Sequence, residues 1–234
     1  MAHPGREIEF KFAVQDRQAF DRLVAHLNLP ASFLAEGITQ VNHFFDSTKL
    51  CLHKNHFAIR LREQKHENFL TIKGRHQREK KENILLTDRV EKEVAIARQD
   101  AEDLLHGRKS PQQLIFDHFK NESASILDNI QTACNDDKLL YIGKFSNVRI
   151  HLPPVTLQAG KTTETLEFEL DACTFPGGSV EYEIEIEISA HSDAQRIEEA
   201  LIELFQQAGI EWQAAPSKAE RFFATLANSQ DPLT

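Results

Sequence analysis

The chain has 234 residues, of which 41% are hydrophobic and 27% are charged, and its formal net charge is −9. This composition is typical of a globular protein, and it contains no apolar run long enough to span a membrane. The acidic balance disfavours nucleic-acid binding, which relies on a basic surface, so any anion site must be a local cluster of Lys and Arg.

The cysteines and the N-terminal segment bear on the location of the protein. The first ten residues lack the apolar core of a signal peptide. Cys51, Cys134 and Cys173 are few, odd in number and form no CxxC pair. This pattern predicts thiols in a reducing cytoplasm and not a disulfide scaffold.

A strand over residues 7–14 is the first predicted element, and it opens with the sequence EIEFKF. Successive side chains of a strand point to opposite faces, so Glu7, Glu9 and Lys11 share one face, opposite three apolar residues. A helix is predicted at 16–28, with Asp16 as its cap. The first strand alone is explained by one solvated face, so the question is whether other strands repeat the pattern.

The pattern recurs along the chain. Further strands are predicted at residues 38–46, 57–63, 68–74, 89–96, 144–152, 165–172 and 180–189. The charged segment 75–83 is expected to be a flexible hairpin loop. A helical insertion is expected at about 100–135, with Ser110-Pro111 starting one of its helices.

Two helices are expected after the last strand. One covers residues 192–208, and a shorter one begins near Pro216. We therefore expect a single domain over residues 1–228, followed by a disordered tail at 229–234.

The charged faces of the strands carry a consistent mixture of residues. The basic residues are Lys11, Arg60, Arg62, Lys73 and Arg149. The acidic residues are Glu7, Glu9, Glu91, Glu93, Glu169, Asp171, Glu183, Glu185 and Glu187. Glutamates that share a strand face repel one another, so they need counter-charges. If the helices cover the apolar face of the sheet, the sheet encloses a charged interior that suits a phosphate chain with a divalent metal.

The order of the motifs resembles the CYTH superfamily, the triphosphate tunnel metalloenzymes, and among them the inorganic triphosphatases and thiamine triphosphatase. EIEFK fits the ExExK signature of that family. The other matching motifs, in family order, are NHFFDS, FAIRLR, LTIKG, RVEKE, SNVRI, LEFELD, YEIEIE and the SK of PSKAER.

The resemblance implies an α+β fold, in which an eight-stranded antiparallel β-barrel forms a tunnel with a charged interior and helices pack outside. It also implies an enzyme that uses Mg²⁺ or Mn²⁺ to hydrolyse inorganic triphosphate to pyrophosphate and phosphate. Glu7, Glu9 and Lys11 would be catalytic. The triphosphate would contact Lys11, Arg60, Arg62, Lys73, Arg149 and Lys218. The metal ligands would be Glu7, Glu9, Glu169, Asp171, Glu183 and Glu185, supported by Glu91 and Glu93.

One position departs from the family pattern. Thr174 stands where some plant members have a lysine near the leaving phosphate, and Lys161 and Arg221 are alternative residues for that contact. The single tryptophan, Trp212, does not match the residue that stacks on thiamine in thiamine triphosphatase.

Several functions stay open from the sequence. They are thiamine or nucleoside triphosphate hydrolysis, adenylyl cyclase activity, and non-catalytic binding of polyphosphate or nucleotide. The expected partner is a small polyphosphate, with neither nucleic acid nor membrane, and the expected state is a monomer or homodimer.

Overall fold

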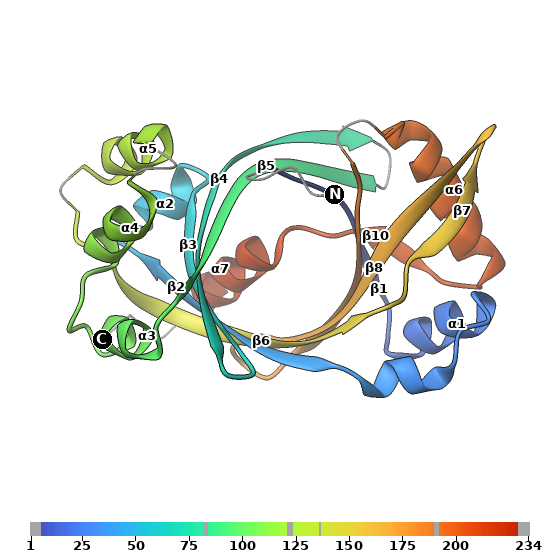
Figure 1. Ribbon diagram of the computed structural model, residues 1–234, viewed down its shortest axis with the longest axis horizontal. Helices are drawn as coiled ribbons and strands as arrows, with labels where there is room; N and C mark the ends of the chain where they lie inside the picture. The colour runs from blue at the N-terminus through green and yellow to red at the C-terminus, as the bar shows by residue number, and fades with distance from the viewer. Residues whose placement is uncertain (1–5, 82–83, 121–123, 136, 190–191, 229–234) are drawn as a thin grey trace.

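Strands that alternate between charged and apolar residues close into a β-barrel (Figure 1). The computed structural model describes residues 6–81, 84–120, 124–135, 137–189 and 192–228. The eight antiparallel strands follow one another around the barrel in the order β1-β5-β4-β3-β2-β6-β8-β9, and β9 pairs with β1 to close it. The strands are β1 (Arg6–Val14), β2 (Ile38–Asp46), β3 (Ala58–Gln64), β4 (Glu67–Lys81), β5 (Ile84–Ile96), β6 (Leu140–His151), β8 (Thr162–Thr174) and β9 (Val180–Glu187).

Two short strands extend the barrel at its edges. β7 (Val155–Ala159) pairs with β8, and β10 (Trp212–Ala214) pairs with β1. Neither was expected from the sequence, because each is too short to show a clear alternation.

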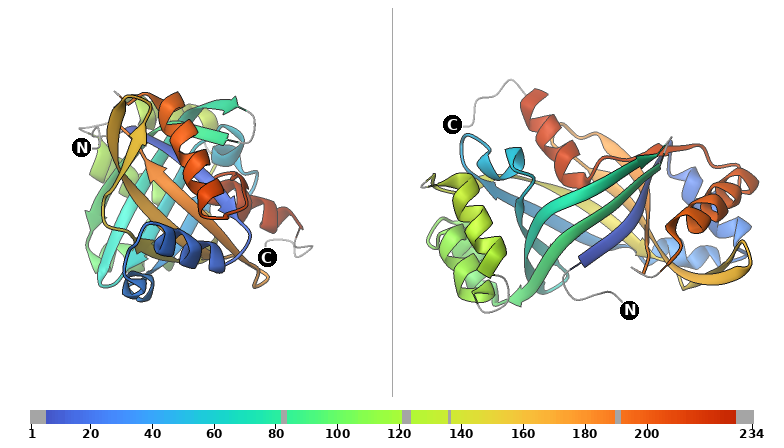
Figure 2. Two further views of the ribbon diagram at one scale, coloured as in Figure 1. Left: turned by 90° about the vertical axis from the view of Figure 1, so that its right-hand side faces the viewer. Right: turned by 90° about the horizontal axis from the view of Figure 1, so that it is seen from above.

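The helices pack outside the barrel, as expected. They are α1 (Gln18–His26), the 3₁₀ turn η1 (Ala31–Ala35), α2 (Cys51–Lys54), α3 (Arg98–Leu105), α4 (Pro111–Phe119), α5 (Ala124–Cys134), α6 (Ala194–Gln207) and α7 (Lys218–Asn228). Figures 1 and 2 show α2 to α5 at one end of the molecule and α1 with α6 at the other. None of the described helices is long and apolar enough to cross a membrane.

The core lies between the outer face of the barrel and these helices. Phe10 and Phe12 of β1 are fully buried and pack in one cluster with Leu201 and Phe205 of α6. A second cluster joins β3 and β4 to the helices that follow β5. The apolar face of the barrel is therefore turned outward under helices, which leaves the charged face inside.

Local sequence signals set several helix ends as predicted. The Ser110 hydroxyl accepts a hydrogen bond from the Gln113 backbone N–H at 3.0 Å, with Pro111 in the first turn. Asp193 accepts one from the Arg196 N–H at 3.3 Å, and Gly209 ends that region with φ of +66°.

The expectation of a flexible loop at 75–83 was wrong. β4 continues to Lys81 and β5 resumes at Ile84, where the two residues pair. Residues 82–83 lie outside the described part, as does the expected tail at 229–234. A dense run of charge predicts exposure to solvent, but it does not prevent backbone pairing in a two-stranded ribbon.

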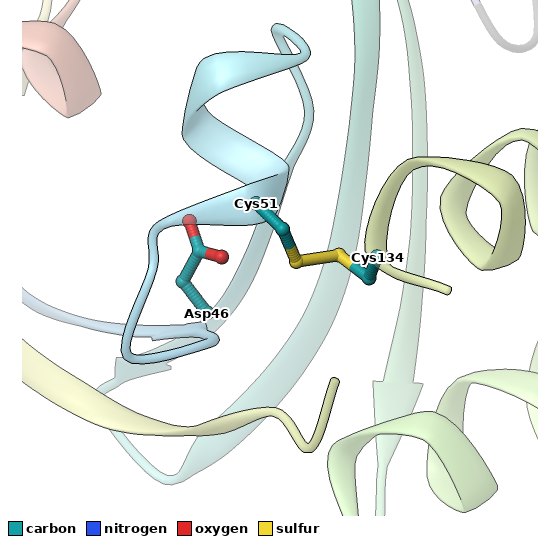
Figure 3. Close-up of side chains that lie close together, drawn as sticks. All are labelled: Asp46, Cys51 and Cys134. Carbon is teal, nitrogen blue, oxygen red and sulfur yellow. A yellow bond between two sulfur atoms is a disulfide. The ribbon is translucent and has the colours of Figure 1, made fainter. Parts of the chain in front are cut away.

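The expectation of three free thiols was also wrong. Cys51 of α2 and Cys134 of α5 form a disulfide, and their Cα atoms lie 5.2 Å apart (Figure 3). The two cysteines are 83 residues apart in sequence, so only the packing of α5 against α2 brings them together. Asp46 lies beside them, and its carboxylate accepts hydrogen bonds from the backbone N–H groups of Leu52 and His53 at 2.9 Å.

Candidate functional site

A charged cavity inside the barrel brings the predicted site residues together. Its lining includes the six predicted triphosphate-binding residues, Lys11, Arg60, Arg62, Lys73, Arg149 and Lys218. It also includes the predicted acidic residues Glu7, Glu91 and Glu185. The other five predicted residues, Glu9, Glu93, Glu169, Asp171 and Glu183, form ion pairs with basic residues of this lining.

β8 and β9 form an acidic wall of the barrel interior, and Glu185 of this wall reaches the lining of the cavity. The register places Glu169 directly opposite Glu185, and Asp171 directly opposite Glu183. Like charges in these positions destabilise a sheet unless cations neutralise them. Oxygen atoms of Glu169, Asp171 and Glu185 lie within 4.8 Å of one another, which is close enough to share one metal ion.

Cations of the same chain neutralise this acidic wall. Lys218 Nζ lies 2.9 Å from Asp171 and 2.8 Å from Glu185, and it also contacts Glu183. Arg149 Nη2 lies 2.6 Å from both Asp171 and Glu185.

These pairs fix the charge state of the buried carboxylates. Burial favours the neutral forms of Asp171 and Glu185. Nevertheless, Lys218 and Arg149 hold the pKa of Asp171 below its usual range. Lys11 does the same for the pKa of Glu185. Reciprocally, burial lowers the pKa of Lys218, and the carboxylates more than offset this, so its pKa is raised.

β1 and β5 build a second acidic group around Arg89. Register pairs Glu7 with Arg89, whose Nε contacts the Glu7 carboxylate and whose Nη2 lies 3.0 Å from Glu9 Oε1. Lys11 Nζ also lies 2.9 Å from Glu9 and contacts Glu185. Arg89 is therefore a shared counter-charge for both β1 glutamates.

The two β1 glutamates differ in their pKa. Burial opposes ionisation of Glu7, but Arg89 and Lys73 hold its pKa well below the usual range. For Glu9, burial and then the charge of Glu7 raise the pKa to about 7, despite Lys11. Neighbouring carboxyls with separated pKa values are a common feature of acid–base sites.

The opposite part of the cavity carries the basic residues of β3 and β4, held by Glu91 and Glu93 of β5. Arg62 Nη2 lies 2.7 Å from Glu93, and Arg60 Nη2 lies 3.3 Å from the same carboxylate. Lys73 Nζ lies 2.6 Å from Glu91. Glu91 and Glu93 thus pair with the basic residues of β3 and β4, whereas the support expected of them was for the metal ligands.

Sequence reasoning missed Arg89, although the RVEKE motif contains it. The signal was available, because Arg89 is in phase with Glu91 and Glu93 on the inner face of β5. Sequence reasoning also missed the neutral residues of the cavity, above all Asn42 of β2, which is 1% exposed.

The residues considered for the leaving-group contact do not line the cavity. Thr174 and Lys161 are exposed. Arg221 of α7 lies 2.7 Å from Glu181, contacts Glu183, and stacks over the Phe175 ring at 5.2 Å. Trp212 packs edge-on against Phe12 on the outer face of the barrel, away from the cavity.

The fold and the site together define an antiparallel barrel whose interior carries acidic and basic residues joined in ion pairs. This chain belongs to the CYTH family, since the CYTH domain model matches residues 5–223. No curated protein sequence matches it significantly.

Solved structures share the fold. A candidate adenylyl cyclase from Hippeastrum, with a dominant triphosphatase activity, is 23% identical, covers 94% of this chain and 96% of its own, and superposes with a TM-score of 0.69. A candidate adenylate cyclase from Bacillus halodurans is 23% identical, with coverages of 94% and 99% and a TM-score of 0.61. The PH1819 protein from Pyrococcus horikoshii is 19% identical, with the same coverages and a TM-score of 0.55.

Proposed function

We propose that this protein is an inorganic triphosphatase, which hydrolyses tripolyphosphate to pyrophosphate and phosphate with Mg²⁺ or Mn²⁺. One observation carries the proposal: six basic strand residues and Lys218 converge inside the barrel beside a group of largely buried carboxylates. A pure anion site would gain nothing from those carboxylates, because they repel phosphate. The triphosphatase activity of the Hippeastrum protein supports the same class of reaction.

The acidic residues fit a hard divalent cation. Carboxylate oxygens are the ligands that Mg²⁺ and Mn²⁺ prefer, and those of Glu169, Asp171 and Glu185 already lie within 4.8 Å of one another. The full proposed metal set is Glu7, Glu9, Glu169, Asp171, Glu183 and Glu185. A bound metal would neutralise phosphate charge and acidify a coordinated water.

The residues of the chain have the following proposed roles. Arg60, Arg62 and Arg149 stabilise the charge on the phosphoryl oxygens during an in-line displacement. Glu9 accepts the proton of the attacking water at a carboxylate oxygen, and without metal its pKa is raised to about 7 by burial and by the charge of Glu7. Lys11 lies 2.9 Å from Glu9 and binds a phosphate oxygen beside it.

The alternative substrates carry an organic group, for which the cavity offers little. Within the described part of the chain, the aromatic residues of the lining are Phe44 and Phe145. Both rings pack against Phe222, with centroids 4.9 and 6.1 Å away, and belong to a buried cluster. This favours tripolyphosphate over thiamine triphosphate, nucleotides and cyclisation of ATP. A cytoplasmic location and a monomeric or homodimeric state stay predictions.

The test is phosphate release from tripolyphosphate, thiamine triphosphate and ATP, side by side, with Mg²⁺, with Mn²⁺ and with chelator. Fast, metal-dependent turnover of tripolyphosphate is expected. Faster turnover of ATP or thiamine triphosphate would show that the substrate proposed here is wrong, while the proposed active site would stand.

Glu9→Gln separates an enzyme from a binder. The variant should lose at least about 100-fold in kcat and still bind tripolyphosphate, because the basic residues are intact. Glu203→Gln, on the exposed face of α6, is the matched control. A wild-type protein that binds tripolyphosphate tightly without turning over any of the three compounds would be a binding module.

A further inference from the structure

A row of amide side chains crosses the inner face of β2, β3 and β6. Gln40 Nε2 donates to Gln64 Oε1 at 2.7 Å, and Asn147 Nδ2 donates to Gln40 Oε1 at 3.1 Å. Asn42 Nδ2 donates to Asn147 Oδ1 at 2.9 Å. Gln40, Asn42 and Asn147 all line the charged cavity.

Asp171, which forms ion pairs with Arg149 at 2.6 Å and Lys218 at 2.9 Å, fixes the orientation of the amides at one end of this row. Asn147 Nδ2 donates to Asp171 Oδ1 at 2.6 Å, and an ionised carboxylate can only accept. The Asn147 side chain must therefore point its oxygen toward Asn42, and Asn42 must donate a hydrogen bond to that oxygen from its nitrogen. Asn42 Oδ1 is left as the free end of the row.

This free oxygen is a buried acceptor without a donor. Asn42 is 1% exposed, and its Oδ1 has no hydrogen-bond partner among the described residues. A buried unpaired carbonyl is costly, so such an atom in a native protein calls for a bound donor.

A buried donor without a described partner lies on the neighbouring strand. Arg62 is the direct cross-strand partner of Asn42, and its Nε is buried and unpaired within the described part of the chain. Elsewhere in the guanidinium, Nη2 lies 2.7 Å from Glu93, and Cζ lies 5.1 Å from the centroid of the Phe69 ring.

We propose that Asn42 and Arg62 hold one water molecule, which accepts a hydrogen bond from Arg62 Nε and donates one to Asn42 Oδ1. An ionised phosphate oxygen is an acceptor and cannot satisfy Asn42, whereas water satisfies both atoms. The water fixes the plane of the guanidinium, so Asn42 is a positioning residue for triphosphate binding through Arg62. This inference rests on the proposed function, because it assigns Arg62 to the triphosphate.

The first test is titration of the full-length protein with tripolyphosphate in the presence of EDTA, which needs no turnover. Threonine and valine have the same shape, and only threonine offers an oxygen acceptor. Asn42→Val should raise the Kd by about five- to tenfold, and Asn42→Thr should recover most of the loss. Gln64→Met removes the amide at the far end of the row, outside the cavity lining, and should leave the Kd within about twofold.

The Kd separates a positioning role from a structural one. If Asn42 only stabilises the fold through Asn147, Asn42→Val lowers the melting temperature and leaves the Kd unchanged, which would overturn the proposal. Should the Val variant fail to fold, Asn42→Ala and Asn42→Ser repeat the comparison.

The second test is a high-resolution crystal structure of the wild-type protein. A water within about 3.2 Å of both Asn42 Oδ1 and Arg62 Nε is expected. Direct bonding of Asn42 Oδ1 to a protein donor would overturn the proposal. If tripolyphosphate binds but is not hydrolysed, the proposed function is refuted and the proposed role of Asn42 is not. If tripolyphosphate does not bind at all, the crystal structure still shows whether a water lies between Asn42 and Arg62.

Discussion

Arg89 gives the sharpest test of how this barrel tolerates a charged interior. Its side chain is 8% exposed, contacts Glu7, and lies 3.0 Å from Glu9, which is itself nearly fully buried. Arg89→Leu keeps the apolar bulk and removes the shared cation. Removing one partner of a buried ion pair costs about 3–5 kcal/mol, and the cost lies toward the lower end here because Glu7 keeps Lys73 at 3.6 Å and Glu9 keeps Lys11 at 2.9 Å.

The expected loss is large for a protein of this size. About 3–5 kcal/mol is a third or more of the stability of many domains, and at about 2–4 °C per kcal/mol it lowers Tm by about 6–20 °C. The assay is thermal and urea unfolding with EDTA, so that metal does not replace the lost cation. Arg98→Leu removes an exposed i,i+4 pair with Glu102 and should cost no more than about 0.5 kcal/mol.

The effect of Arg89→Leu should depend on pH. In the wild type, the lowered pKa of Glu7 contributes stability above its unfolded pKa, and this is lost as pH falls through the lowered folded pKa. Without Arg89, the effect of burial on Glu7 is opposed chiefly by Lys73, so the pKa of Glu7 should rise and the carboxyl should protonate at a higher pH than in the wild type. The difference in the free energy of unfolding between Arg89→Leu and the wild type should be largest near pH 8 and should shrink toward pH 5. A loss below about 1 kcal/mol at pH 8, or one independent of pH, would refute this reasoning.

Three further outcomes are expected. The kcat/KM for tripolyphosphate should rise through about pH 7, where Glu9 ionises, and fall above about pH 8, where buried Lys73 loses its proton. Lys73→Arg should move the fall in activity to higher pH. Maximal activity of the wild type near pH 5 would contradict these assignments of Glu9 and Lys73. Cys134→Ser, or reduction of the disulfide with Cys51, should lower the free energy of unfolding by about 2–4 kcal/mol in urea titrations, and an unchanged midpoint would show that the disulfide does not constrain the chain. Arg149→Leu should lower kcat/KM by about 100-fold in a phosphate-release assay, because this side chain joins three carboxylates of the site, and a change under about threefold would remove it from the site.

Much of the fold could be predicted from the sequence, because the period of two sets strand faces locally. EIEFKF alone indicated that Glu7, Glu9 and Lys11 share a face, and β1 places them inward as a set. Ser110-Pro111 likewise predicted the start of α4. The long β4–β5 ribbon could not be predicted in this way, because charge density signals exposure without specifying backbone pairing.

The sequence determined the signs of the charges inside this barrel, and the tertiary structure decided which of them meet. Alternation tells which side chains share a face, but the register between distant strands is set when the barrel closes. Closure places Glu169 opposite Glu185, and it brings Lys218, from a helix after the last barrel strand, into contact with Glu185 and Asp171. In the same way, Arg89 reaches Glu7 across 82 residues of sequence, and the free oxygen of Asn42 follows from contacts with β6 and β8 that no local pattern contains.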